Sequence, residues 1–232
     1  MSLYVPNESE IEMMRAILAV QAWILGLYKN VVSPDGSMTM LQLVEMPTGG
    51  GRTYAQKVLT QEFAAALAAN KWYLSLNAAG KAEGAYHNTY LEWEFAAADV
   101  ADVNTVRGVF AFCYVVPFDA GQSEGPIKVG DTVTGHTSAA TGIVTGVVVT
   151  SGAWATDDAA GYLFIKTKTG TFQNDEEIWV GGVKWAVSNT GTLFAGDAHK
   201  KLVFLEELPE AKLIDTAGQK IRCNVKWSLS TQ

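Results

Sequence analysis

Apolar and polar residues alternate along several stretches of the chain, and the clearest case lies near its middle. Residues 91–95 alternate between apolar side chains and the carboxylates of Glu92 and Glu94, which is the two-residue period of a strand with one buried and one solvated face. Residues 106–116 then form a nearly continuous apolar run, as expected of a strand covered on both faces. With residues 99–104 as the turn, the sequence predicts that these two strands form an antiparallel pair.

A helix is predicted at the start of the chain. Asn7 and Glu10 match the capping-box pattern, and apolar residues follow at helical spacing until about Gln21. Residues 63–69 are alanine-rich and fit a short helix or a strand. Further strands are predicted at residues 23–29, 71–76, 201–206 and 221–229.

A different pattern marks residues 127–189, where turn residues alternate with short β-branched runs. The first half predicts, in order, a turn, a strand, a polar loop and a second strand: residues 130–131, 132–134, 135–140 and 142–150. The pattern repeats in a degraded form about 45 residues later, which pairs Gly130 with Asp175 and Val133 with Ile178. Because β-branched residues suit a pleated sheet and disfavour a helix, this stretch is predicted to be a small β-module.

The module interrupts a larger β-rich domain. Polar, glycine-containing connectors at residues 119–126 and 191–196 flank it, and amphipathic strands precede the first connector and follow the second. Insertion at a surface loop whose ends lie close together is physically easy. The sequence therefore predicts a mainly β fold: a β-rich host domain with a short N-terminal helix (residues 1–119 and 197–232), interrupted by an inserted β-module (residues 120–196).

Composition narrows the class of protein. With 48% hydrophobic and 18% charged residues, the chain of 232 residues can bury a core and is not a disordered tail. The net charge of −7 and the lack of a Lys/Arg run argue against direct nucleic-acid binding, because phosphate binding needs clustered positive charge. Residues 16–28 form an apolar stretch too short to span a bilayer, and no basic signal region precedes them. We therefore expect no membrane partner.

Candidate catalytic groups are few. Glu92 and Glu94 are closely spaced, but they occupy the solvated face of their strand, whereas a catalytic carboxylate needs burial or a like-charged partner to shift its pKa. His136 and Ser138, with the aspartates at residues 157–158, supply the residue types of a hydrolase triad. No nucleophile elbow or oxyanion pattern accompanies them. We therefore expect no enzyme and no catalytic residues.

Metal and cofactor sites are weakly indicated. The three histidines are widely separated: His87, His136 and His199. Asp175, Glu176 and Glu177 offer oxygen atoms to calcium but lack the alternating spacing of a calcium loop, so solvated turn charge is the favoured interpretation. Residues 48–52 are rich in glycine but lack the Gly-Lys-Ser/Thr ending of a phosphate-binding loop, which leaves an exposed loop able to contact a neighbouring subunit. No metal and no cofactor are expected.

Cysteine, methionine and tryptophan residues each allow two interpretations. Cys113 and Cys223 are expected to be free buried thiols, because no framework of spacings supports a disulfide. The methionine pairs at residues 13–14 and 38–40 fit core filling better than a soft binding surface. Three tryptophans of the module are expected to pack in its core, with a shallow glycan-binding groove as the alternative: Trp154, Trp179 and Trp185.

The module also carries a resemblance. The phrase GDTVTG at residues 130–135, followed by TSAATGIV at residues 137–144, resembles a small β-module of tailed-bacteriophage virion proteins. The second copy departs from the phrase at its glycines and threonines. Three flanking segments are similar to phage structural proteins: LYKN at residues 27–30, GRTYA at residues 51–55, and the Trp93 strand leading into VRGVF at residues 106–110.

The resemblance implies a non-enzymatic virion structural protein. The favoured form is a capsid decoration or cement protein that binds the head exterior and stabilises the shell, after synthesis in the cytoplasm of the bacterial host. Its implied partners are the major capsid protein and copies of itself in a symmetric oligomer. A tail, neck or baseplate component is the first alternative, and a host-surface glycan-binding module is the second.

Overall fold

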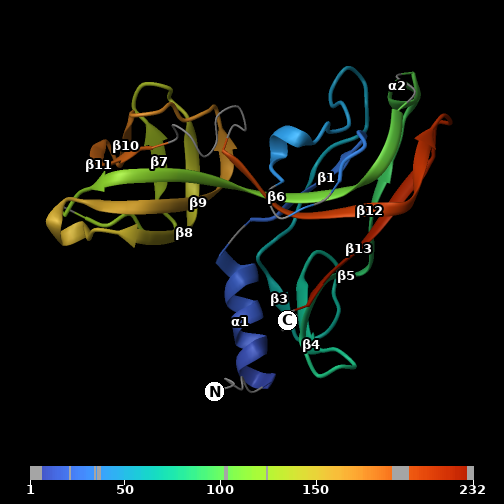
Figure 1. Cartoon of the computed structure of the whole chain (residues 1–232), viewed down its shortest axis with the longest axis horizontal. Helices are drawn as coiled ribbons and strands as arrows, with labels where there is room; N and C mark the ends of the chain where they lie inside the picture. Colours follow the sequence, from blue (N-terminus) through green and yellow to red (C-terminus); the bar gives the residue numbers. More distant parts are fainter. Residues whose placement is uncertain are drawn as a thin grey trace. The chain divides into compact units, whose positions relative to one another are not determined.

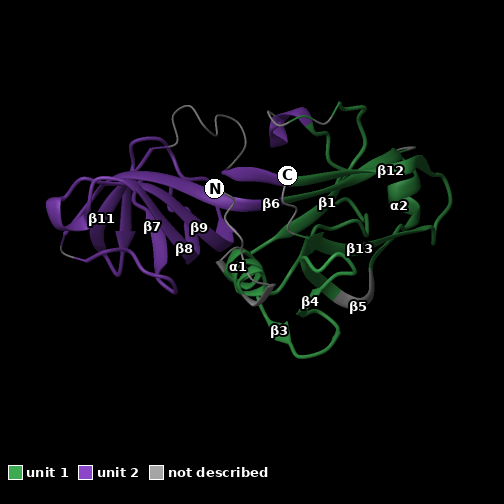
Figure 2. Ribbon diagram, turned by 60° about the horizontal axis from the view of Figure 1, so that its bottom comes forward, with its two compact units in different colours: residues 1–35, 43–111, 204–232 green, residues 36–42, 112–203 purple. Residues whose placement is uncertain are grey.

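The computed structural model describes residues 7–20, 22–33, 35, 38–101, 104–123, 125–189 and 199–228, with the backbone alone at residues 7, 8, 20 and 87–90. The fold is mainly β, with one N-terminal helix and several sheets (Figure 1). The chain divides into two compact units (Figure 2). Unit 1 comprises Met1–Asp35, Leu43–Ala111 and Phe204–Gln232, and unit 2 comprises Gly36–Gln42 and Phe112–Val203.

Unit 1 encloses its core between two groups of strands. One group comprises β1 (Ile24–Tyr28), β2 (Lys57–Val58) and the unit 1 parts of β6 (Asn104–Gly121) and β12 (Lys200–Ile214). The other has the order β13-β5-β4-β3, with bounds Lys220–Ser228, Ala82–Glu94, Trp72–Leu76 and Phe63–Ala64. Side chains of both groups share one buried cluster, which includes Leu27 and Val109 from the first and Trp72 and Trp93 from the second.

Helix α1 (Asn7–Val20) packs on β4 and β5 through Met14 and Leu18. Glu10 is buried and accepts hydrogen bonds from the β5 side, at 3.3 Å from the backbone nitrogen of Ala82 and 3.1 Å from the Lys81 Nζ. The predicted helix is therefore confirmed, but Glu10 bonds to a tertiary neighbour, and the side chain of Asn7 lies outside the described residues.

Unit 2 contains a closed six-stranded antiparallel barrel, visible on the left of Figure 1. Its strands after β6 are β7 (Thr132–Gly135), β8 (Thr141–Ser151), β9 (Ala159–Thr169), β10 (Glu177–Val180) and β11 (Val183–Ser188). Pairing runs β6-β9-β8-β7-β10-β11, and β11 returns to β6 through Val187 opposite Asp119 and Ser188 opposite Phe118. Closure leaves these strands without an open edge, which explains how short β-branched strands form a stable unit.

The predicted internal repeat has equivalent backbone hydrogen bonds in its two copies. Gly130 N donates to Val144 O (2.9 Å) and Val144 N to Asp131 O (2.8 Å). In the second copy Asp175 N donates to Ser188 O (2.9 Å) and Ser188 N to Glu176 O (2.8 Å). Gly130 and Asp175 both have a positive φ, at 97° and 57°, and this explains the departure from glycine, because aspartate tolerates the left-handed region better than most residues.

Strands β7 and β10 lie side by side at the junction of the two copies. Val133 faces Val180, Thr134 faces Trp179 and Gly135 faces Ile178. Replacing each residue by its equivalent in the other copy, about 45 residues away, gives the same three pairs. The hairpins β7–β8 and β10–β11 are therefore related by a local two-fold axis. Val133 and Ile178 are fully buried in the barrel core, whereas their neighbours face outward.

The predicted antiparallel pair of residues 91–95 with residues 106–116 is wrong. The first stretch belongs to β5, which pairs with β4 and β13, and the second belongs to β6 in the other sheet. The two strands pack across the unit 1 core and do not hydrogen-bond to each other. The alternation at residues 91–95 and the apolar run at residues 106–116 identified both strands correctly, but neither pattern distinguishes a hairpin from two strands of different sheets.

The connection between β5 and β6 also differs from the predicted turn. Ala97–Val100 form the short helix α2, and Asp99 within it is buried. Residues 102–103 lie outside the described part. Residues 63–69 form only the two-residue strand β3. The strands predicted at 23–29, 71–76 and 201–206 are confirmed as β1, β4 and part of β12, and the strand predicted at 221–229 is confirmed as β13 up to Ser228, since residue 229 lies outside the described part.

Strand β6 contributes residues to both units. The strand continues through Pro117 as far as Gly121, and its residues from Phe112 onward belong to unit 2. The Pro117 carbonyl accepts from Asn189 N (2.9 Å). In a strand the nitrogen and the carbonyl of one residue point to the same side, so the Pro117 nitrogen also faces Asn189. There β12 begins near Val115, whose nitrogen donates to His199 O (2.8 Å), and β11 ends opposite Phe118. A proline is tolerated because its missing N–H falls between two neighbouring strands.

No helix among the described residues is long and apolar enough to cross a membrane.

Candidate functional site

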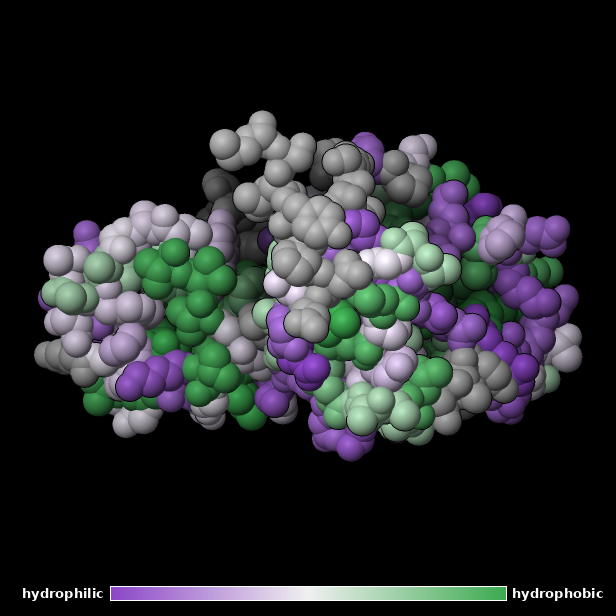
Figure 3. Space-filling model, turned by 90° about the horizontal axis from the view of Figure 1, so that it is seen from below, coloured by the Kyte–Doolittle hydropathy of each residue, from purple (hydrophilic) through white to green (hydrophobic). Residues whose placement is uncertain are grey.

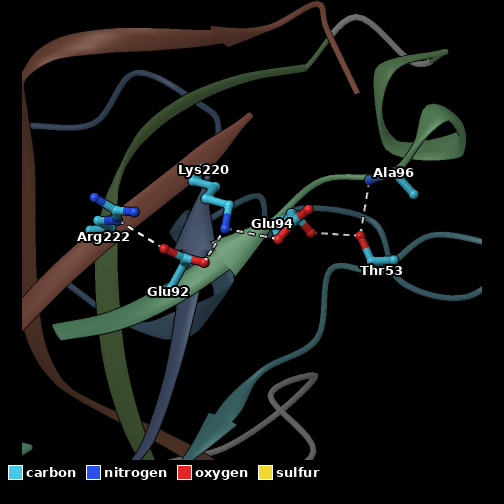
Figure 4. Close-up of polar contacts among 6 residues, drawn as sticks. All are labelled: Thr53, Glu92, Glu94, Ala96, Lys220 and Arg222. Atoms are coloured by element: carbon cyan, nitrogen blue, oxygen red, sulfur yellow. Dashed lines mark hydrogen bonds and ion pairs between the residues drawn. The ribbon is translucent and has the colours of Figure 1, made fainter. Parts of the chain in front are cut away.

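Glu92 and Glu94 lie in a ladder of opposite charges on β5 and β13 (Figure 4). Lys220 Nζ lies 2.7 Å from Glu92 Oε1 and 3.0 Å from Glu94 Oε2, and Arg222 Nε lies 2.8 Å from Glu92 Oε2. Hydrogen bonds from Lys220 and Arg222 lower the pKa of Glu92. A proton acceptor in catalysis needs a raised pKa at neutral pH, so the geometry supports a solvated charge ladder for this pair.

Asp99 is a buried carboxylate that the sequence did not single out. Its oxygens accept from the backbone nitrogens of Thr53 (3.0 Å), Tyr54 (3.3 Å) and Ala96 (2.8 Å), and from Thr53 Oγ1 (2.9 Å). Burial acts to raise the pKa of Asp99, but these hydrogen bonds outweigh it and hold the pKa below its ordinary value. Thr53 Oγ1 also lies 2.6 Å from the Glu94 carbonyl oxygen (Figure 4). Asp99 and Thr53 together therefore fix the loop before β2 to the end of β5.

The three consecutive acidic residues considered for calcium have separate partners. Glu176 is buried, and it accepts from Thr137 N (3.1 Å), Ser138 N (2.9 Å) and Ser138 Oγ (2.8 Å), and also from Gln173 N (2.6 Å). Its interpretation as solvated turn charge is therefore wrong: Glu176 fixes the loop after β7. Asp175 is exposed and accepts from the Asn174 side chain.

The residue types of a hydrolase triad are not brought together. Ser138 donates its hydroxyl to Glu176, and His136 stacks on Trp179. Asp157 accepts from Ser123 N (2.5 Å), while Asp158 accepts from the Thr156 hydroxyl and from Ala153 N in its own turn. Each group has a structural partner.

His199 is a buried histidine at the start of β12. Its Nε2 donates to the carbonyl oxygen of Phe172 (2.9 Å), and Nδ1 has no hydrogen-bond partner among the described residues. Burial lowers the pKa of His199, and the charge of Lys168 acts in the same direction, whereas the Phe172 carbonyl and Glu176 raise it by less. The neutral ring is therefore the form that the fold favours.

This histidine gives a testable pH dependence. Because the pKa is lower in the folded than in the unfolded chain, the free energy of unfolding should be fully maintained above about pH 6.5 and should fall as the pH decreases below that value. Urea unfolding at a series of pH values measures the slope. His199→Asn should flatten it, since asparagine does not titrate and tolerates the positive φ of 66° at this position. His136→Gln is the control, and an unchanged slope in His199→Asn would contradict the assignment.

The three tryptophans of the module have different surroundings. Trp154 stacks on Phe118 (ring centroids 5.2 Å apart), and Trp185 lies against Gly125. Both pack against the barrel core, so core packing is confirmed for these two. Trp179 stands apart: it projects from the outer face of β10 and stacks on His136.

Both cysteines are free, as predicted; Cys113 is buried, whereas Cys223 is only partly buried. Burial raises the pKa of the Cys113 thiol to about 12 and that of Cys223 to about 11, so neither is an activated nucleophile. Among the described side chains, no group of three or more histidine, cysteine, aspartate or glutamate residues is placed to hold a metal ion. The side chain of His87 lies outside the described residues.

The methionines and the glycine-rich loop have ordinary structural roles. Met14 and Met40 are buried, as core filling predicts, whereas half of the Met13 side chain is exposed. In the loop at residues 49–52, the Arg52 guanidinium donates to the Gly49 carbonyl (3.2 Å) and so closes the turn on itself.

Comparison of the chain with protein families, with curated proteins and with solved structures finds no match.

Proposed function

We propose that this chain is a non-enzymatic structural protein of a tailed-bacteriophage virion, acting as a decoration or cement protein on the head exterior. The observation that carries the proposal is that the module residues on which the resemblance rests form part of a closed barrel. Residues 130–135 and 137–144 make β7, the following loop and the first part of β8. A closed barrel joined to a larger β unit suits a protein that acts by contact.

The charge pairs and buried carboxylates support a role in contact and not in chemistry. Glu92, Asp99 and Glu176 each hold neighbouring segments together through several hydrogen bonds or ion pairs. Their oxygens are thereby engaged, and this favours assigning them to stability.

Both units carry exposed apolar side chains available to partners. Figure 3 shows apolar surface (green) interspersed with hydrophilic surface (purple) on one face of the molecule. The largest such side chains on α1, β2, β8 and β11 are Met13, Ile17, Val58, Val148, Val149 and Val183. In this proposal, such positions bind the major capsid protein and further copies of the chain, in a closed symmetric arrangement set by the repeating shell.

Cryo-electron microscopy of the virion, with density assigned to this chain, tests the proposal. We expect density on the head lattice that bridges capsid subunits. Density confined to the neck, tail or baseplate would replace the decoration role with the tail alternative. Absence of the chain from the particle would reject both.

A further inference from the structure

The outer face of the barrel carries four clustered side chains that bond mainly to one another. Trp179 of β10 stacks on His136, with ring centroids 4.1 Å apart and planes inclined by 15°. Its Nε1 donates to Glu177 Oε2 (2.9 Å), and Lys184 Nζ of β11 lies 3.4 Å from Glu177 Oε1. The side chains of His136, Glu177 and Lys184 remain 52%, 40% and 38% exposed. We call these four residues the tryptophan cluster.

The internal repeat indicates that the fold does not need this cluster. In the first copy, the positions equivalent to Glu177 and Trp179 hold Thr132 and Thr134. The backbone hydrogen bonds at the two turns are equivalent, although β10–β11 has a bulge between Ile178 and Trp179 that β7–β8 lacks. A hairpin of this kind therefore forms with threonine at both positions. The loop that carries His136 is fixed separately by Glu176, through Thr137 N and by the backbone and hydroxyl of Ser138.

A row of polar side chains continues from the cluster across the barrel. Lys184 lies opposite Trp179, Trp179 opposite Thr134, Thr134 opposite Thr141, and Thr141 opposite Thr169. The hydroxyls of Thr141 and Thr169 are 2.6 Å apart. Since neighbouring strands are spaced about 4.8 Å, the row extends roughly 19 Å over five strands.

The side chains of this row indicate which class of ligand it can bind. An indole ring offers an apolar platform, and the imidazole of His136, stacked on one of its faces, holds it in place. The threonine hydroxyls both donate and accept hydrogen bonds, as does a sugar hydroxyl, and the charges of Lys184 and Glu177 offset each other. A polyanion such as a nucleic acid would need several cations, and the row contains one lysine.

We propose that this outer face binds a neutral oligosaccharide. Trp179 stacks on the apolar face of one sugar ring, Glu177 and Lys184 bond to the hydroxyls of that ring, and Thr134, Thr141 and Thr169 bond to the rings that follow. A protein that binds a capsid shell by contact needs no such site, so this inference goes beyond the proposed structural role and does not depend on it.

Isothermal titration of the full chain with four neutral hexasaccharides tests the site: cellohexaose, maltohexaose, chitohexaose and xylohexaose. We expect at least one to bind with a Kd below about 1 mM. Trp179→Thr places the residue of the first copy in the second, so it should keep the thermal unfolding midpoint and weaken binding at least about tenfold, equivalent to ~1.4 kcal/mol.

Trp154→Phe is the matched control, because it alters a tryptophan of the same barrel that packs on Phe118 away from the row. It should leave the affinity unchanged. The proposal is overturned if none of the four sugars binds below about 1 mM, or if Trp179→Thr binds as tightly as the unmodified chain. Neither result bears on whether the chain is found on the virion.

Discussion

Replacing Asp99 with alanine is expected to lower the free energy of unfolding by about 3 kcal/mol, since three backbone N–H groups lose their acceptor. Those groups belong to Thr53, Tyr54 and Ala96, and Tyr54 is buried. Alanine also removes the carboxylate that reaches back from the first turn of α2 to the N-cap backbone. Urea denaturation of the full chain at neutral pH measures the change.

The Asp99 effect also has a predicted pH dependence. Because its pKa is lowered in the fold, the stabilisation is present above the ordinary aspartate pKa of about 3.9 and is lost as the pH falls below it. The difference between the unmodified chain and Asp99→Ala should therefore shrink in acid. Glu94→Ala is the control, because 59% of that side chain is exposed. Equal destabilisation by both variants at neutral pH would contradict the assigned role of Asp99.

Glu176→Ala should destabilise unit 2 by a similar amount, about 3 kcal/mol. The substitution removes the acceptor of Thr137 N, Ser138 N and Gln173 N and leaves a space beside Gly135, where Glu176 now packs. We expect a lower midpoint in thermal unfolding. Hydrogen exchange should show faster exchange at the amides of residues 137 and 138.

The internal repeat provides the matched control. Asp131 is the equivalent of Glu176 in the first copy, and its carboxylate accepts from Lys128 N alone (2.7 Å) among the bonds of the described residues. Asp131→Ala should cost about 1 kcal/mol, the ordinary value for one such bond. If it destabilised the chain as much as Glu176→Ala, the loop would not owe its position to Glu176.

Strands, the helix and the turns could be predicted from the sequence, because each depends on a pattern that spans only a few residues. The alternation at residues 91–95 and 221–229 identified β5 and β13, and the capping residues located α1. The offset of the two copies predicted equivalent turns, which Gly130 and Asp175 form. The two-residue period of a strand also predicted that the Glu92 side chain points outward.

Pairing between distant strands was decided only by the tertiary structure. The apolar pattern of β6 shows that the strand is covered on both faces. It does not show that the first half of the strand belongs to unit 1 and the second half to the barrel. Closure of the barrel between β6 and β11 depends on residues about 70 positions apart, and a two-residue period carries no information on which strand lies beside which.

The burial of Asp99 and Glu176 was likewise decided by the tertiary structure. A carboxylate is expected at the surface unless hydrogen bonds compensate for its loss of water, and most of the donors that compensate lie some 40 residues away in sequence. The sequence alone determined the mainly β character, the N-terminal helix and the repeated turns, because each is set by neighbours along the chain. The sheet partners, the closed barrel and the buried carboxylates required the fold, because each is set by contacts between segments that are far apart in sequence.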